Sequence, residues 1–295
     1  MTTEAIEFFL KKYLADRPLF LSLIRAKEAA LFQKYLPFKK PVLDVGCGDG
    51  FFAKTILSMK YQKLNSNNQT SSKIQNPNTN SIEGIDVGLD LSTSRMGEAR
   101  ELGVYNKIVT FDGVHIPFPD RKAIPIPDRK FATVISNCVL EHVERLPELL
   151  TEIHRVLAPG GVFITTVMAK PWEENLVGTM FLGNTYKMYL RRKQAHLNLF
   201  TRDEWRSAFI KGRFRVIGEI GYLSPAACRL IDVCHYLSIP NLMSYTLFGK
   251  WVLTPGFPPY PLAWLSNVVS EPVEPDLSGA LFYVLEKHSK AIDKK

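Results

Sequence analysis

The stretch that most constrains the fold of this chain runs from Val42 to Gly50. A short apolar run, Val42 to Val45, ends in three alternating glycines at positions 46, 48 and 50, and residues 51–59 then have the pattern of a helix. A buried strand that turns sharply into a helix brings backbone N–H groups and a helix N-terminus to one edge of a sheet. In an open α/β sheet, this edge binds nucleotide-like ligands.

Three kinds of ligand-binding loop compete for this pattern, beside a tight turn that binds nothing. A dinucleotide-binding loop requires G-x-G-x-x-G, but Phe51 stands where its third glycine belongs. A phosphate-binding P-loop requires G-x-x-x-x-G-K-[ST], and here Lys54 and Thr55 fit but Ala53 replaces the glycine. The third pattern, Asp44-x-Gly46-x-Gly48-x-Gly50, is matched in full.

Apolar runs and helical segments alternate between residues 41 and 167. The predicted strands are 42–45, 87–91, 107–111, 131–136 and 162–167, and two more follow at 214–220 and 280–286. Strands that alternate with helices form a mostly parallel sheet with helices on both faces. The sequence therefore predicts an α/β fold, with a doubly wound sheet as the middle of three layers.

Three stretches lie outside this core. Residues 1–40 carry apolar side chains at helical spacing, which predicts two helices broken near Arg17-Pro18. Residues 65–81 are rich in Asn, Ser, Thr and Gln and predict a disordered insertion. The expected domains are a helical cap at 1–40, a core at 41–220 plus 280–288, and a second insertion at 221–279.

The second insertion is poor in charge. Between Val233 and Ser270 the only formal charge is Lys250, beside seven aromatic residues, and several prolines argue against a plain membrane-spanning helix. This composition predicts a lid over an apolar pocket, a protein interface or a patch on a membrane surface. The net charge of +8 is mostly scattered along the chain, which disfavours a nucleic-acid partner.

Cysteine usage and the N-terminal residues suggest the compartment. The four cysteines include no CxxC pair, so neither a disulfide frame nor a metal site is predicted. Charged residues interrupt the early apolar positions, so no secretory signal is expected. These features predict a cytoplasmic protein, peripheral at a membrane if the insertion is a membrane patch.

The glycine loop and five later motifs resemble those of the Rossmann-like (class I) S-adenosylmethionine methyltransferases, in the small-molecule branch that includes the ubiquinone/menaquinone enzymes. The matching segments are Asp44–Gly50, Gly88–Ser92, Phe111–Gly113, Ser136–His142, Leu157–Gly161 and His196–Thr201. Several motifs in the right order are jointly specific, although each alone is weak. The resemblance implies a seven-stranded sheet of order 3-2-1-4-5-7-6 with strand 7 antiparallel. It also implies S-adenosylmethionine as cofactor and S-adenosylhomocysteine as product.

The same resemblance implies a cofactor site at the ends of the first four strands. Its expected residues are Asp44, Gly46, Cys47, Gly48, Gly50, Asp90, Leu91, Asp112, Gly113, Asn137 and Cys138. Asp44 would meet the cofactor's ammonium, Asp90 its ribose hydroxyls and Asp112 its adenine amine. Two alternatives stay open: Asp90 as a helix N-cap with Asp86 on the ribose, and Asp112 as a plain turn residue.

Methyl transfer from a sulfonium needs alignment and water exclusion more than acid–base chemistry. If the acceptor must lose a proton, the candidate bases are His142 and His196, with Glu141 or Tyr186 behind them. The uncharged aromatic insertion favours a small, apolar or lipid-like acceptor. The alternative is a non-catalytic protein that binds S-adenosylmethionine and docks to a partner through the insertion.

Overall fold

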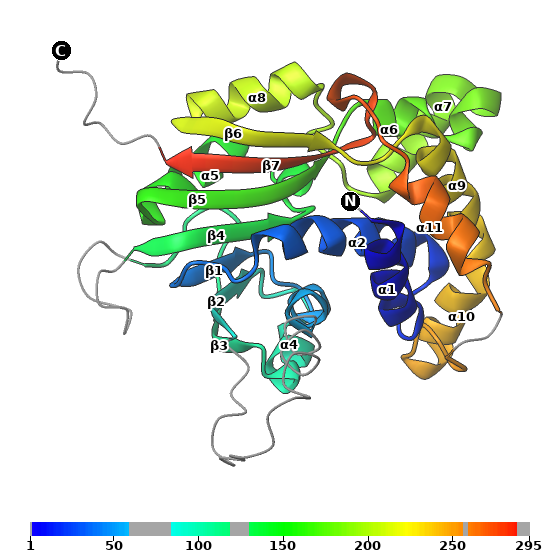
Figure 1. The fold of residues 1–295 in the computed structure, drawn as a ribbon, viewed down its shortest axis with the longest axis horizontal. Coiled ribbons are helices and arrows are strands. Elements are labelled where there is room, and N and C mark those ends of the chain that lie inside the picture. Colours follow the sequence, from blue (N-terminus) through cyan, green and yellow to red (C-terminus); the bar gives the residue numbers. More distant parts are fainter. Residues whose placement is uncertain (1, 59–83, 119–129, 256–258, 288–295) are drawn as a thin grey trace.

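The computed structural model describes residues 2–58, 84–118, 130–255 and 259–287. Its centre is a seven-stranded sheet of order β3-β2-β1-β4-β5-β7-β6 (Figure 1). β7 runs antiparallel to both β5 and β6, and the other pairs are parallel. The predicted strand order is therefore confirmed. The strands are β1 Val42–Val45, β2 Ile85–Asp90, β3 Tyr105–Thr110, β4 Phe131–Asn137, β5 Leu157–Met168, β6 Phe214–Gly221 and β7 Ala280–Lys287.

Helices cover both faces of the sheet (Figure 1). They are α1 Thr3–Leu14, α2 Leu19–Phe32, α4 Met96–Leu102, α5 Leu146–Val156, α6 Pro171–Glu174, α7 Val177–Lys193, α8 Arg202–Lys211, α9 Pro225–Leu237, α10 Ile239–Phe248 and α11 Leu262–Ser270. Short 3-10 turns lie at Gln33–Tyr35, Leu140–His142 and Pro275–Leu277, and residues 51–58 are also helical. The N-terminal helices break at Pro18, as predicted, because proline has no N–H to continue a helix.

The alternation of side chains along the strands divides the core into two apolar layers. On β7, Phe282 and Val284 pack with α1, α2, α9 and α11, whereas Leu281 and Tyr283 pack with α5 and α8. Phe282 contacts the ring of Phe32 edge-on, with ring centroids 5.3 Å apart. Burying a large apolar side chain stabilises a fold by about 1.5–3 kcal/mol. These contacts anchor α2 beside the carboxyl ends of β1 and β4.

The insertion at 221–279 is mostly helical. It forms α9, α10 and α11, which gather with α1 and α7 at one end of the sheet (Figure 1). α9 and α11 bury residues against α2 and α1, whereas none of the residues of α10 is buried. Among the described residues, no helix is both long enough and apolar enough to cross a membrane. The predicted disordered insertion at 65–81 lies outside the described residues.

Candidate functional site

The glycine loop is fixed by its contacts with two neighbouring strands. The N–H groups of Gly46 and Cys47 donate to the carbonyl of Leu89, at 2.8 and 2.9 Å. Gly46 has φ +82°, and a Cβ there would lie 2.3 Å from a methyl group of Val139, just after β4. Gly48 has φ +56°, and a Cβ there would meet no atom within 4 Å. The loop thus leaves an open cradle above Gly48 that only a residue without a side chain keeps clear.

Asp90 closes this loop from the end of β2. Its carboxylate accepts from the N–H of Gly48 at 2.5 Å and from the N–H of Leu91 at 2.7 Å. α4 begins at Met96 with Arg95 as its N-cap, so Asp90 is not a helix cap. Asp86 accepts from the N–H of Val42, at the amino end of β1, which is the end opposite the glycine loop. Of Asp86 and Asp90, only Asp90 therefore lies at the glycine loop.

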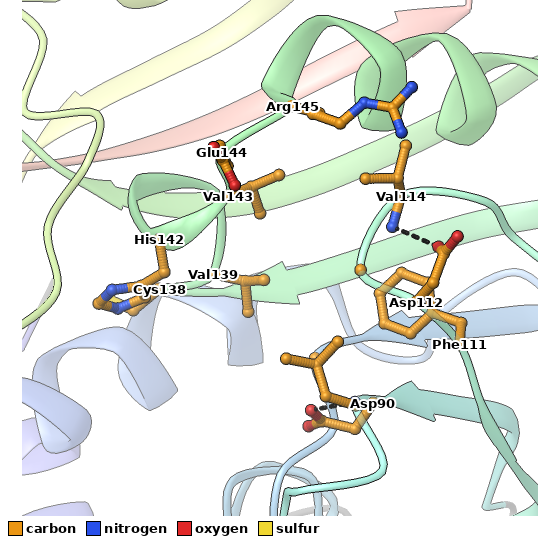
Figure 2. Close-up of a pocket in the computed structure, with 13 residues that line it drawn as sticks. Asp90, Phe111, Asp112, Val114, Cys138, Val139, His142, Val143, Glu144 and Arg145 are labelled. Carbon is orange, nitrogen blue, oxygen red and sulfur yellow. Dashed lines mark hydrogen bonds between the residues drawn. The ribbon is translucent and has the colours of Figure 1, made fainter.

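Two cavities meet at Gly46. One, of about 490 Å³, is lined by Asp90, Asp112, Cys138 and His142, among others. Figure 2 shows Asp90 and Asp112 on one side of this cavity and His142 with Cys138 on the other. The second cavity, of about 350 Å³, lies over the glycine loop and is lined by Asp44, Asn137 and three arginines, Arg17, Arg25 and Arg95. Clefts of this size suit a small organic ligand.

Asp112 organises the loop after β3. One of its oxygens accepts from the N–H groups of Val114 and His115, at 2.9 and 2.6 Å, and the other contacts the His115 ring at 2.7 Å. These hydrogen bonds, led by the one from the His115 ring, hold the pKa of Asp112 well below its usual range. Asp112 thus stabilises the turn in which it lies. Asp112 and Gly113 nevertheless line the larger cavity together with Leu91 and Phe111.

Asp44 is the buried acid of the site. It is 5% exposed, and the hydroxyl of Tyr105 donates to it at 2.6 Å. Burial raises its pKa to about 7, and the nearby charge of Asp90 adds to this effect, while the Tyr105 hydrogen bond opposes it. Burial also raises the pKa of the Cys47 thiol, so Cys47 is a packing residue and no nucleophile.

Asn137 and Cys138 are held by a residue that the sequence analysis missed, Glu28 of α2. The fully buried Glu28 accepts from the Asn137 amide at 2.9 Å and from the Cys138 thiol at 3.0 Å. It also accepts from Arg25 at 2.6 Å and from the hydroxyl of Tyr222 at 2.8 Å. Cys138 has φ +52°, so β4 ends in a strained turn and a 3-10 helix, and α5 begins only at Leu146.

The two predicted bases lie together, but only one reaches the cavity. His142 lines the larger cavity and its ring centroid is 5.1 Å from that of His196. His196 is 8% exposed, and burial lowers its pKa to about 4. Glu141 is fully buried beside them, and burial raises its pKa. Tyr186, the other predicted partner, instead donates to Asp232 of α9 at 2.5 Å.

The second cavity carries further charges that the motifs did not predict. Asp49, inside the glycine loop, pairs with Arg17 at 2.5 Å and with Arg95 at 2.8 Å. Arg17 also stacks on the ring of Phe51, 4.4 Å from its centroid. The only sequence signal for Arg17 was the helix break beside it. Each of the three arginines is paired with a carboxylate of the protein, Arg17 and Arg95 with Asp49 and Arg25 with Glu28, and a guanidinium has further N–H groups that a carboxylate ligand would complement.

Comparison with known proteins gives the family. A family model described as a methyltransferase domain matches residues 9–217. The chain is 28% identical over 181 residues to the mitochondrial arginine-hydroxylase NDUFAF5 of Rattus norvegicus, covering 61% of this chain and 39% of that protein. It is 29% identical over 93 residues to the demethylmenaquinone methyltransferase of Symbiobacterium thermophilum, covering 30% of this chain and 35% of that protein. These matches span well under half the length of either relative.

A solved structure from Thermotoga maritima has a similar chain path. It is described as an S-adenosylmethionine-dependent methyltransferase and a possible histamine N-methyltransferase. Its TM-score is 0.49 at 15% identity, over 97% of this chain and 99% of that one. The family assignment rests on the matched model, which spans most of the chain and includes the glycine loop, Asp90 and Asp112. The protein therefore belongs to the class I S-adenosylmethionine-dependent methyltransferases.

Proposed function

We propose that this chain transfers a methyl group from S-adenosylmethionine to a small apolar acceptor. The observation that carries the proposal is the pair of cavities that meet at Gly46, beside the open cradle above Gly48. S-adenosylmethionine has an adenosine half and an amino-acid half joined at the sulfonium. One half fits each cavity, which puts the sulfonium near Gly46 and Cys138.

The side chains of each cavity match the half proposed for it. In the larger cavity, Asp90 offers a carboxylate to the ribose hydroxyls, and Phe111 offers an apolar wall to the adenine ring. In the second cavity, Asp44 faces the expected ammonium, while Arg17 and Arg25 face the expected carboxylate. A nucleotide polyphosphate fits less well, because the acidic Asp44 and Asp90 flank the loop where phosphates would lie.

The cofactor, when bound, supplies an electrophilic methyl group. The chain then has to align the acceptor with this group and keep water out. Asn137 and Cys138 are held rigidly by Glu28 at the meeting point of the cavities, which suits alignment. His142 is the predicted base that lines the larger cavity, so it is the proposed proton acceptor where the substrate must lose one.

The exposed surface of the insertion favours an apolar acceptor that is reached at a membrane. Leu242, Met243, Leu247 and Phe248 of α10 are each more than half exposed, at 53%, 59%, 69% and 63%. Lys250 follows just after Gly249, the C-cap of the helix, and no acidic residue lies on the helix. Exposed apolar side chains beside a cation suit the surface of an anionic bilayer. The matched demethylmenaquinone methyltransferase acts, by its name, on a quinone. We therefore propose a peripheral position on the cytoplasmic side of a membrane.

The methyltransferase proposal is tested by titrating the protein with S-adenosylmethionine and assaying S-adenosylhomocysteine release against a panel of quinones and lipids. We expect binding and turnover on at least one apolar acceptor. Binding without turnover on any acceptor would favour the non-catalytic docking alternative, and turnover of polar acceptors alone would overturn the acceptor class.

The membrane proposal is tested by flotation with anionic phosphatidylglycerol vesicles. We expect Leu247→Asp with Phe248→Asp to abolish flotation without unfolding the protein, because neither residue is buried. The control is Leu277→Asp, since Leu277 is 61% exposed but lies on the short turn before β7. If wild-type protein does not float, or if the α10 variant floats as well as wild type, the membrane proposal fails.

A further inference from the structure

We propose that Glu141, His142 and His196 form a binding site for one divalent transition-metal cation, such as Zn²⁺ or Mn²⁺. Each residue offers one ligand atom, and the three atoms lie within 4.8 Å of one another. Metal–nitrogen and metal–oxygen bonds of about 2.0–2.2 Å span up to roughly 4.2 Å between two ligand atoms, so small side-chain rotations suffice to close the site. The sequence analysis predicted no metal site, because these residues are 54–55 positions apart and follow no metal-binding spacing.

Two of the three side chains carry buried polar atoms that the protein leaves unsatisfied. Oε2 of Glu141 and Nδ1 of His196 have no hydrogen-bond partner among the described residues. Glu141 is fully buried, and His196 is 8% exposed. An unsatisfied buried polar atom costs about 1–3 kcal/mol, so native folds rarely keep two of them side by side. A cation between them would satisfy both atoms at once.

The third side chain is already oriented as a metal ligand. Nδ1 of His142 lies 3.0 Å from the carbonyl oxygen of Ala195. A carbonyl can only accept, so Nδ1 carries the proton and the Nε2 lone pair is free in the neutral ring. Histidines that bind metals commonly have their second ring nitrogen fixed in this way by a carbonyl or a carboxylate.

The two segments that carry the ligands are held together by the backbone. The N–H groups of Leu197 and Asn198 donate to the carbonyl of Glu141, at 2.8 and 2.9 Å. The Asn198 amide also donates to the carbonyls of Leu140 and Val143, at 2.9 and 2.7 Å. These hydrogen bonds fix the loop after α7 against the turn after β4. The three ligands are thus presented by a preformed scaffold, which lowers the ordering cost of binding an ion.

The ligand set also indicates the kind of ion and its use. Two imidazoles and one carboxylate suit a divalent transition metal, and three protein ligands leave positions for an exogenous ligand. His142 is the ligand that lines the larger cavity, on the side of Cys138 where the sulfonium is proposed, so the open positions would face the reacting methyl group. This role rests on the proposed function and replaces His142 as the base when the ion is bound: the cation would bind an acceptor oxygen, whose proton passes to solvent water, and would hold the resulting anion for methyl transfer.

The site itself is tested by metal content. Purified protein is stripped with EDTA, dialysed against ZnCl₂, MnCl₂ or CoCl₂, passed through a desalting column and analysed by mass spectrometry. We expect about one ion per chain for wild type and for the control His154→Gln, against less than about 0.1 for Glu141→Gln and His196→Gln. His154 lies on α5 against Phe214 of β6, outside the cluster. Wild type that holds no more ion than Glu141→Gln would overturn the site.

Thermal unfolding and cobalt absorption guard against variants that simply fail to fold. Removing the ion from wild type should lower its Tm by about 5 °C or more, because a ligand present far above its Kd stabilises the native state. The Glu141→Gln variant should show no such change when EDTA is added. Co²⁺-loaded wild type should show visible absorption bands from nitrogen and oxygen ligands. A Tm insensitive to EDTA, with no cobalt bands, would also overturn the site.

Product assays separate this inference from the proposed function. Metal binding without turnover on any acceptor would leave the site standing and overturn the proposed function. Turnover by a chain that binds no ion would overturn the metal site and leave the proposed function standing. Metal binding with turnover that is unchanged after EDTA treatment would overturn the role in acceptor activation. Binding of S-adenosylmethionine, measured by calorimetry, should change less than about twofold on metal removal, because none of the three ligands is among the residues proposed to hold the cofactor.

Discussion

Replacing Glu28 by alanine should be among the most destabilising single substitutions in the cofactor region. Glu28 is fully buried and accepts hydrogen bonds from four groups on three parts of the chain: Arg25, the neighbouring Asn137 and Cys138, and Tyr222. The substitution leaves all four donors without their acceptor. It also leaves the Arg25 guanidinium, whose side chain is 24% exposed, without its counter-charge.

The expected magnitude follows from this arrangement. Removing one partner of a buried ion pair costs about 3–5 kcal/mol, because the remaining charge stays desolvated. For a chain of this length each kcal/mol lowers Tm by about 2–4 °C, so Glu28→Ala should lower Tm by roughly 10 °C. The double variant Glu28→Leu with Arg25→Met removes both charges and should recover much of this loss. The control Glu7→Ala breaks an exposed pair with Lys11 on α1 and should cost less than about 0.5 kcal/mol.

Urea unfolding followed by circular dichroism measures these differences, and calorimetry with S-adenosylmethionine measures the consequence at the site. Because Glu28 positions Asn137 and Cys138, the Glu28→Ala variant should also bind the cofactor at least about tenfold more weakly. A loss of stability below about 1 kcal/mol, matching Glu7→Ala, would show that the four hydrogen bonds do not act as one buried network. Unchanged cofactor affinity would refute the positioning role.

Three further predictions concern the loop and its acids. Gly46→Ala should lower the free energy of unfolding, measured in urea, by about 2–4 kcal/mol, because left-handed backbone strain adds to the contact with Val139. The control Gly103→Ala has φ +63° and no atom within 4 Å of the added Cβ, so it should cost only the strain, about 1–2 kcal/mol. Equal costs for the two glycines would contradict the overlap with Val139. Asp90→Asn should weaken S-adenosylmethionine binding by about 10–100-fold in calorimetry, since charge-assisted hydrogen bonds contribute about 1.5–3 kcal/mol. An affinity within twofold of wild type would show that Asp90 does not bind the ribose. Asp44 has a folded pKa of about 7, so its contribution to stability is full below its unfolded pKa and is lost as pH rises through 7. The cofactor's ammonium should bind the ionised carboxylate, so binding should release up to one proton near pH 6, where Asp44 is protonated, and little at pH 8. Calorimetry in buffers of different ionisation enthalpy measures the release, which Asp44→Asn should abolish, and proton uptake by wild type at pH 6 would contradict the pairing.

The glycine loop was predicted because it depends on local chemistry, whereas the strand order was implied by the resemblance to a known family and is confirmed. The loop needs left-handed residues at fixed spacing, and only glycine adopts that conformation cheaply, so Gly46, Gly48 and Gly50 are visible in the sequence. Asp90 was also predictable, since it follows a buried strand whose register is set by its neighbours. The start of α8 is likewise set by local chemistry, since Thr201 and Glu204 form a capping box.

What the sequence did not show depends on contacts between distant segments. Glu28 looks like an ordinary charged residue on a helix, and its partners Asn137 and Tyr222 lie 109 and 194 positions away. Periodicity gives the face of a helix but not which residue of another element meets it. The prolines of the insertion argue against a plain membrane-spanning helix, but they do not exclude shorter helices. Two of them stand at the first turns of α9 and α10, where a missing N–H costs nothing.

Tyr222 links the cofactor region to the insertion at 221–279. It follows β6 directly, two residues before Ser224 caps α9, and its hydroxyl donates to Glu28 inside the cofactor region. Burial raises its pKa well above the usual range, so the hydroxyl stays protonated and serves only as a donor to that carboxylate. The insertion therefore begins at a residue that helps to hold Asn137 and Cys138.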